Sequence, residues 1–146
     1  MGRISIIGGG AWGTALACVA RRAGHEAVMW VREPDVVKSI NANLGNPVFL
    51  PGIDLENDIF ATTDLAASAS GADAILLVAP SQFLRQVVEQ LMPGLPATVP
   101  LVICAKGIEQ GTCALMTEVV DESSRGQPIA VLSGPTFAKE VAAGLP

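Results

Sequence analysis

Residues 3–15, RISIIGGGAWGTA, form the pattern from which the fold can be predicted. A short apolar run ends at Ile7 and is followed by a cluster of glycines that includes Gly8, Gly10 and Gly13. Glycine weakens both strands and helices, so glycines at this density indicate a turn whose backbone needs room. The spacing G-x-G-x-x-G, placed after a strand-like run and before a helix-like one, predicts a strand, a tight turn and a helix in succession.

Each of these glycines has its own task in such a turn. Gly8 permits the tight bend, Gly10 lets the backbone approach a pyrophosphate, and Gly13 lets the helix pack close to the strand. The helix N-terminus then offers free N–H groups and the positive end of its dipole to the phosphates. The alternative is a plain glycine-rich turn without a ligand. A second strand at the expected distance along the chain favours a dinucleotide site.

The rest of the chain alternates between apolar runs of strand length and helical patterns. Strands are expected at Arg3–Ile7, Ala27–Val31, Ala74–Ala79, Leu101–Ala105 and Ile129–Leu132, with a weaker one at Ile59–Thr62. Helices are expected at Ala11–Ala23, Pro34–Leu44, Leu65–Ser70, Ser81–Met92, Ala114–Ser124 and from Thr136 onward. Continuous apolar runs indicate parallel strands buried on both faces. The alternation predicts an α/β fold of the Rossmann type, a doubly wound, mainly parallel sheet.

Composition narrows the classes of protein and partner. Half of the 146 residues are hydrophobic and 16% are charged, which is typical of a single compact domain and excludes a disordered polar chain. The formal net charge is −5 and the nine Lys and Arg residues form no basic stripe, so nucleic acid is not an expected partner. No apolar run approaches the roughly 20 residues that span a bilayer, and the first residues lack the pattern of a secretory leader, in which a charged region is followed by an apolar stretch and a cleavage site. We expect a cytoplasmic protein without membrane insertion.

The three cysteines give no sign of a site. Cys18, Cys104 and Cys113 are odd in number, lack metal-ligand spacing and lie in apolar stretches. We expect reduced thiols in the core, with no disulfide and no bound metal.

The end of the second strand bears on the choice of cofactor. A NAD-binding unit usually carries Asp or Glu about 20 residues beyond the glycines. Here the chain reads MWVRE, with Arg32 at that point and Glu33 beside it. A guanidinium can pair with a 2′-phosphate in two-pronged fashion, which favours NADPH, while Glu33 keeps NAD open. An ordinary solvated arginine is the alternative.

Three more segments follow strands and point to the same edge of the sheet. APSQ contains Pro80, KGIE contains Lys106, and SGPTF contains Gly134 and Thr136. In an open α/β sheet, ligands bind outside the carboxyl ends of the strands, so these segments are expected to line one crevice with the glycine turn. An ammonium directly after a buried strand favours a ligand contact for Lys106 over a surface position.

These segments together resemble a known family. GGGAWGTA, MWVRE, GNPVFLPGI, APSQ, KGIE and LSGPTFAKEVAAGLP are similar to the N-terminal domain of the bacterial NAD(P)-dependent sn-glycerol-3-phosphate dehydrogenases, from residue 3 to the end. The resemblance implies hydride transfer between NAD(P)H and dihydroxyacetone phosphate, giving sn-glycerol 3-phosphate for phospholipid synthesis. A related two-domain dehydrogenase, of the ketopantoate or 3-hydroxyacyl-CoA type, and a non-catalytic NAD(P) sensor stay open as alternatives.

The resemblance also implies roles for particular residues. Lys106 is implied to contact both cofactor and substrate, and Gly134 and Thr136 the substrate. The cofactor contacts implied by the motifs are Gly8, Gly10, Ala11, Trp12, Gly13, Arg32, Phe49, Pro80, Lys106 and Ala138. Members of the family continue as a helical substrate domain with the proton-transferring lysine. We therefore expect residues 1–146 to be the NAD(P)-binding domain, with no catalytic residue of its own. The oligomeric state stays open, a homo-oligomer included.

Overall fold

The computed structural model describes residues 1–145 and contains one sheet flanked by helices. Its strands are β1 (Arg3–Ile7), β2 (Glu26–Trp30), β3 (Ile59–Thr62), β4 (Ala74–Leu77), β5 (Leu101–Ile103) and β6 (Ile129–Val131). Its helices are α1 (Ala11–Arg22), α2 (Pro34–Asn41), α3 (Leu65–Ala69), the 3₁₀ turn η1 (Ser81–Phe83), α4 (Leu84–Leu91), α5 (Met116–Ser123) and α6 (Ala138–Ala142). Among the described residues no helix has the length and apolar character needed to cross a membrane.

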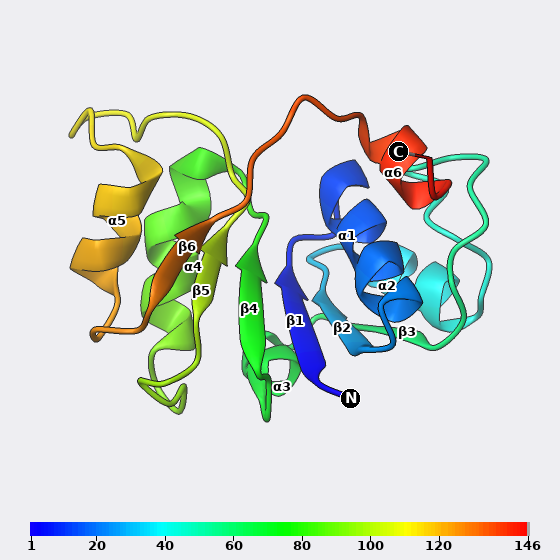
Figure 1. The fold of residues 1–146 in the computed structure, drawn as a ribbon, viewed down its shortest axis with the longest axis horizontal. Helices are drawn as coiled ribbons and strands as arrows, with labels where there is room; N and C mark the ends of the chain where they lie inside the picture. Colours follow the sequence, from blue (N-terminus) through cyan, green and yellow to red (C-terminus); the bar gives the residue numbers. More distant parts are fainter. Residues whose placement is uncertain (146) are drawn as a thin grey trace.

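All strand pairs are parallel, in the order β3-β2-β1-β4-β5-β6 (Figure 1). The chain builds outward from β1 to β3, then returns to β4 on the other side of β1 and builds outward to β6. Because such crossovers are right-handed, the reversal puts the later helices on the opposite face of the sheet. The predicted Rossmann-type sheet is confirmed, and its switch point lies between β1 and β4, where ligands bind in this fold.

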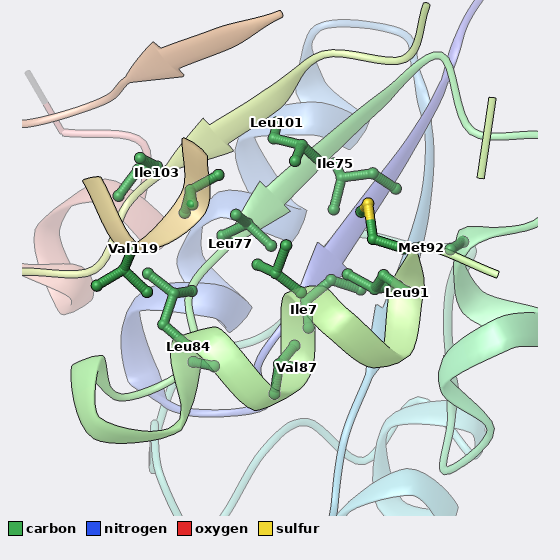
Figure 2. Packing of buried hydrophobic residues seen from close by; sticks show 14 of the residues in the cluster. Ile7, Ile75, Leu77, Leu84, Val87, Leu91, Met92, Leu101, Ile103 and Val119 are labelled. Atoms are coloured by element: carbon green, nitrogen blue, oxygen red, sulfur yellow. The ribbon is translucent and has the colours of Figure 1, made fainter. Parts of the chain in front are cut away.

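The two residues that end β1 show how the core divides into two layers. Ile6 belongs to a cluster with buried residues of α1 and α2, and Ile7 belongs to another cluster that includes Leu84 and Val88 of α4. Successive side chains of a strand point to opposite faces, so both faces of a buried strand must be apolar. Figure 2 shows the second layer, in which Ile7 and Leu77 meet side chains of α4. Packing on both faces of the sheet holds the end of β1 in place, and with it the start of the glycine turn.

Two expectations about burial are wrong. Residues 129–132 were expected to be buried on both faces, but Val131 is 59% exposed and Ala130 is also exposed. The cause is the position of β6 at the end of the sheet, where β5 is its one neighbouring strand in the described chain. Cys113 was expected in the core but is exposed, because it lies in the loop after β5. Cys18 and Cys104 are buried as expected, and all three thiols are free.

The segment after β6 carries the chain across the carboxyl edge of the sheet. It leaves the β6 side, passes above the strand ends and reaches α6 beside α1 (Figure 1). Arg22 of α1 anchors that helix, since its guanidinium donates to the carbonyl of Ala142 at 2.8 Å and to that of Val141. The helix expected from Thr136 begins only at Ala138, so Gly134 and Thr136 lie in the crossing segment itself.

Candidate functional site

The glycine turn joins β1 to α1 at the switch point of the sheet. Gly8 has φ +139°, a backbone conformation that side chains rarely adopt, and a Cβ there would lie 2.9 Å from the carbonyl carbon of Val78. A Cβ on Gly13 would lie 2.0 Å from the carbonyl oxygen of Gly8. A Cβ on Gly10, in contrast, would meet nothing within 4 Å. Protein packing therefore requires glycine at positions 8 and 13, and position 10 faces open space.

A cleft of about 520 Å³ opens over this turn. It extends from the glycine turn toward the end of β2 on one side and α4 on the other. Its lining residues are Gly8, Gly9, Gly10, Trp30, Arg32, Glu33, Phe49, Val78, Ala79, Pro80, Phe83, Gln86, Val87 and Gln90. The Arg32 side chain is 74% exposed, and its Nε lies 3.7 Å from a carboxylate oxygen of Glu33. The mouth of this first cleft thus carries an exposed cation in a loose ion pair with the neighbouring acid.

A second hollow, of about 300 Å³, lies beside Trp12 in the first turn of α1. Its lining residues are Trp12, Cys104, Lys106, Leu132, Ser133, Gly134, Thr136, Phe137 and Ala138. The Lys106 ammonium is exposed and donates one long hydrogen bond, 3.4 Å, to the carbonyl of Gly134. Burial raises the pKa of the Cys104 thiol to about 11, so this thiol is neutral at pH 7.

The loop that carries Lys106 is held from outside the hollow. Gln82 donates to the Ile108 carbonyl at 2.8 Å and accepts from the Gln110 N–H at 2.8 Å. Arg85 of α4 makes two parallel 2.9 Å bonds to the carboxylate of Glu109. These bonds, and a further one from Thr112, lower the pKa of Glu109 to about 2. The APSQ segment and α4 therefore fix the KGIE loop.

Sequence comparison decides which family this site belongs to. A family model described as NAD-dependent glycerol-3-phosphate dehydrogenase N-terminus matches residues 3–146. The chain belongs to this family. A relative from Paramagnetospirillum magneticum, named glycerol-3-phosphate dehydrogenase (NAD(P)+), is 58% identical over 146 residues, which are all of this chain and 53% of that protein. The chain spans about half the length of the curated relatives it matches.

Solved structures agree with this membership. A glycerol-3-phosphate dehydrogenase from Coxiella burnetii superimposes with a TM-score of 0.89 at 38% identity, covering 99% of this chain and 44% of that one. A ketopantoate reductase of the PanE/ApbA family from Ralstonia eutropha superimposes with a TM-score of 0.69 at 22% identity, covering 88% and 40%. The second similarity is one of fold alone, so the glycerol-3-phosphate dehydrogenase family is favoured over the ketopantoate type.

In this member of the glycerol-3-phosphate dehydrogenase family, the residues singled out in the sequence divide between two hollows instead of lining one crevice. Gly8, Gly10, Arg32, Phe49 and Pro80 line the first cleft. The members of the second group line the smaller hollow and are Trp12, Lys106, Gly134, Thr136 and Ala138. The two groups meet at the start of α1, since Gly10 lines the first cleft and Trp12 lines the smaller hollow.

Ala11 and Gly13 line neither hollow. Ala11 packs in a small cluster that joins α1 to α6 through Ala15 and Ala142, and Trp12 packs against the same cluster. Gly13 is buried under the carbonyl of Gly8. The Ala11 side chain serves the packing of α1, so only its backbone is available to a ligand at the helix start, while Gly13 serves the close packing of the turn itself.

Sequence reasoning missed part of the first cleft in this family member. Phe83, Gln86 and Gln90 line it from η1 and α4, and Phe83 is 50% exposed. Their spacing of three and four residues puts them on one helical face, which is a periodic signal that the sequence does carry. A large apolar residue left exposed on that face, directly after the APSQ segment, would have pointed to the cleft.

No side chain caps the start of α1, and in residues 1–145 no group of three His, Cys, Asp or Glu residues is placed to hold a metal ion. The uncapped first turn, the open space at Gly10 and the cation at Arg32 surround one cleft. N–H groups at a helix start together with a cation suit an anionic ligand. The arrangement can bind a molecule with phosphate groups and an extended, partly apolar body.

Proposed function

We propose that this chain is the cofactor-binding part of an oxidoreductase that interconverts dihydroxyacetone phosphate and sn-glycerol 3-phosphate with NAD(P)H. The observation that carries the proposal is the glycine turn at the switch point, open to a cleft at Gly10, in a chain of the glycerol-3-phosphate dehydrogenase family. The nicotinamide cofactor, when bound, supplies or accepts the hydride. The product would feed glycerophospholipid synthesis.

The residues of the first cleft fit a dinucleotide. Gly8, Gly10, Ala11 and Gly13 shape a turn whose N–H groups are assigned to the pyrophosphate. Phe49 and Pro80 supply apolar lining to the cleft. Trp12 and Ala138 stand at the adjoining hollow and are assigned to the nicotinamide end. A cradle of open backbone with apolar walls matches the size and polarity of such a ligand.

The choice between NADP and NAD is assigned to Arg32. Its guanidinium is exposed at the end of β2 and is free to turn toward a 2′-phosphate. Charge-assisted bonds to phosphate are the strongest that such a side chain makes, so we favour NADPH. The neighbouring Glu33 carboxylate disfavours a second negative charge, and NAD is expected to bind as well.

The second hollow is assigned to the substrate. Lys106, Gly134 and Thr136 lie at its wall, where an ammonium, backbone groups and a hydroxyl converge. Lys106 would bond to the substrate and balance the negative charge that develops on its carbonyl oxygen. The proton itself is assigned to a lysine in a helical domain after residue 146, which makes residues 1–146 the NAD(P)-binding domain. The protein is expected to act in the cytoplasm.

The test measures binding and turnover of the full-length gene product. Calorimetric titration is expected to show binding of NADPH and NADH, and NADPH oxidation should be fast with dihydroxyacetone phosphate and negligible with ketopantoate. Absence of heat with either cofactor at millimolar concentration would overturn the cofactor assignment. Binding without turnover of either substrate would instead favour a nucleotide-sensing module.

A further inference from the structure

A buried hydrogen-bond network lies directly beneath the glycine turn. Asn46, in the loop between α2 and β3, is 1% exposed. Its amide Nδ2 donates to the carbonyl of Gly9 at 2.9 Å and to Thr14 Oγ1 at 2.8 Å. The fully buried Thr14 hydroxyl donates in turn to the carbonyl of Gly10 at 2.9 Å. One side chain from a distant loop thus reaches both carbonyls of the turn, one directly and one through Thr14.

The same amide also holds the wall of the first cleft. Asn46 Oδ1 accepts the backbone N–H of Phe49 at 3.1 Å. The Gly9 carbonyl can only accept and the Phe49 N–H can only donate, so the orientation of the amide is determined by its partners. Both amide hydrogens and the amide oxygen are therefore in use. The loop is further tied down by Leu50, which is buried against Ala15 of α1.

The bonded atoms determine where the free N–H groups of the turn point. In a trans peptide unit the C=O and the following N–H point in opposite directions, and no peptide bond in residues 1–145 is cis. Holding the Gly9 carbonyl toward Asn46 therefore directs the N–H group of Gly10 away from it. The Gly10 carbonyl, and with it the direction of the Ala11 N–H, is held by the Thr14 backbone N–H at 3.0 Å as well as by the Thr14 hydroxyl. Glycine peptides rotate easily, so without this hold the turn would populate other orientations.

We propose that Asn46 is a positioning residue for dinucleotide binding, acting through Thr14 and the glycine turn and, separately, through Phe49. The inference rests on the proposed cofactor site and deepens it. A ligand gains affinity from groups that are ordered before it arrives, because the ordering cost has already been met by folding. Loss of the network should weaken the grip on the pyrophosphate, which NADH and NADPH share, and affect both cofactors alike.

Asn41 offers a matched control. Its side chain makes the same kind of two-point bond to a backbone, donating to the Ala61 carbonyl at 2.9 Å and accepting from the Ala61 N–H at 2.8 Å. It joins α2 to β3 and lines neither hollow. Asn41→Ala and Asn46→Ala each remove two or more backbone bonds, so both should lower the melting temperature. Of the two, only Asn46→Ala removes a bond to the glycine turn.

The experiment measures Kd for NADH and NADPH and the melting temperature, using the full-length gene product. We expect Asn46→Ala to raise both Kd values by about tenfold or more, and Asn41→Ala to leave them within about twofold. Kinetically, KM for the cofactor should rise more than kcat falls. Wild-type Kd values in a folded Asn46→Ala variant, or equal weakening by Asn41→Ala, would overturn the proposal.

A second pair of variants keeps the test decisive if Asn46→Ala does not fold. Thr14→Val preserves the shape of the side chain and removes the hydroxyl that joins Asn46 to Gly10, whereas Thr14→Ser keeps that hydroxyl. We expect Thr14→Val to weaken the binding of both cofactors and Thr14→Ser to retain most of the wild-type affinity. Equal Kd values for these two variants would contradict the proposal. Wild-type protein that binds neither cofactor would refute the proposed function instead.

Discussion

The two hollows are held open by different kinds of interaction. The glycine turn of the first cleft is held by neutral groups, Asn46 and Thr14, that are almost fully buried. The Lys106 loop of the second hollow is held by Gln82 and, in addition, by a charged pair, Arg85 and Glu109, that keeps contact with solvent. Neutral buried bonds do not respond to pH or salt, whereas a partly exposed ion pair responds to both. The glycine turn is therefore held by groups that do not titrate, and the Lys106 loop is held in part by an ion pair that is lost at low pH.

The largest expected effect lies in the second hollow. Lys106→Ala should lower kcat/KM for dihydroxyacetone phosphate about a hundredfold or more, as loss of one stabilising donor does. The fold should survive because the ammonium is exposed. Lys139→Ala is the control, since this neighbouring lysine of α6 lines neither hollow. Near-normal turnover in a folded Lys106→Ala variant would contradict the assignment of the second hollow to the active site.

The next effect separates packing from ligand binding in the first cleft. Gly13→Ala puts a Cβ against the Gly8 carbonyl, so it should lower the free energy of unfolding by about 1–3 kcal/mol and weaken NADPH. Gly10→Ala meets no protein atom within 4 Å, and its stability should stay within about 1 kcal/mol. Gly10→Ala should nonetheless weaken the binding of NADPH. Urea unfolding and calorimetric titration check the pair; equal stability losses would contradict the distinction.

A smaller effect concerns the mouth of the first cleft. Arg32→Ala should weaken NADPH about tenfold and leave NADH nearly unchanged, because the lost partner is the 2′-phosphate. The effect is limited by solvent, since the Arg32 side chain is 74% exposed, and it should shrink further at high salt. Titrations at low and high ionic strength measure it. Equal losses for both cofactors would show that the side chain stacks on the adenine.

The smallest effect tests the ionic hold on the Lys106 loop. The bonds from Arg85 lower the folded-state pKa of Glu109 from 4.5 to about 2, so the stabilisation is complete above pH 4.5 and is lost as the pH falls toward 2. The difference in urea midpoint between wild type and Glu109→Gln should be constant from pH 7 to 5 and shrink below. The difference for Asn46→Ala should not shrink with it. If the differences in urea midpoint for Glu109→Gln and Asn46→Ala both shrank in parallel as the pH falls, the contrast between the two hollows would be contradicted.

Much of the first cleft was predictable from local pattern. Gly8, Gly10 and Arg32 were placed from their spacing after β1 and β2, and the structure puts all three on one cleft. Phe83 and Gln86 were missed, although their spacing along one helical face is visible in the sequence. The exposure of Val131 could not be foreseen, since an edge strand and a central one have the same apolar pattern.

The sequence by itself determined the order of strands and helices, the strand–turn–helix at Gly8 and the family. The elements and the turn follow from periodicity and spacing over a few residues, where local sterics and hydrophobic burial dominate. The family followed from the resemblance of several motifs to those of known proteins. Only the tertiary structure decided that Asn46 holds the carbonyl of Gly9, 37 residues away, and that Gln82 holds the loop of Lys106. Such bonds join segments that pattern alone does not bring together, because their geometry depends on how the packed sheet and helices position each loop.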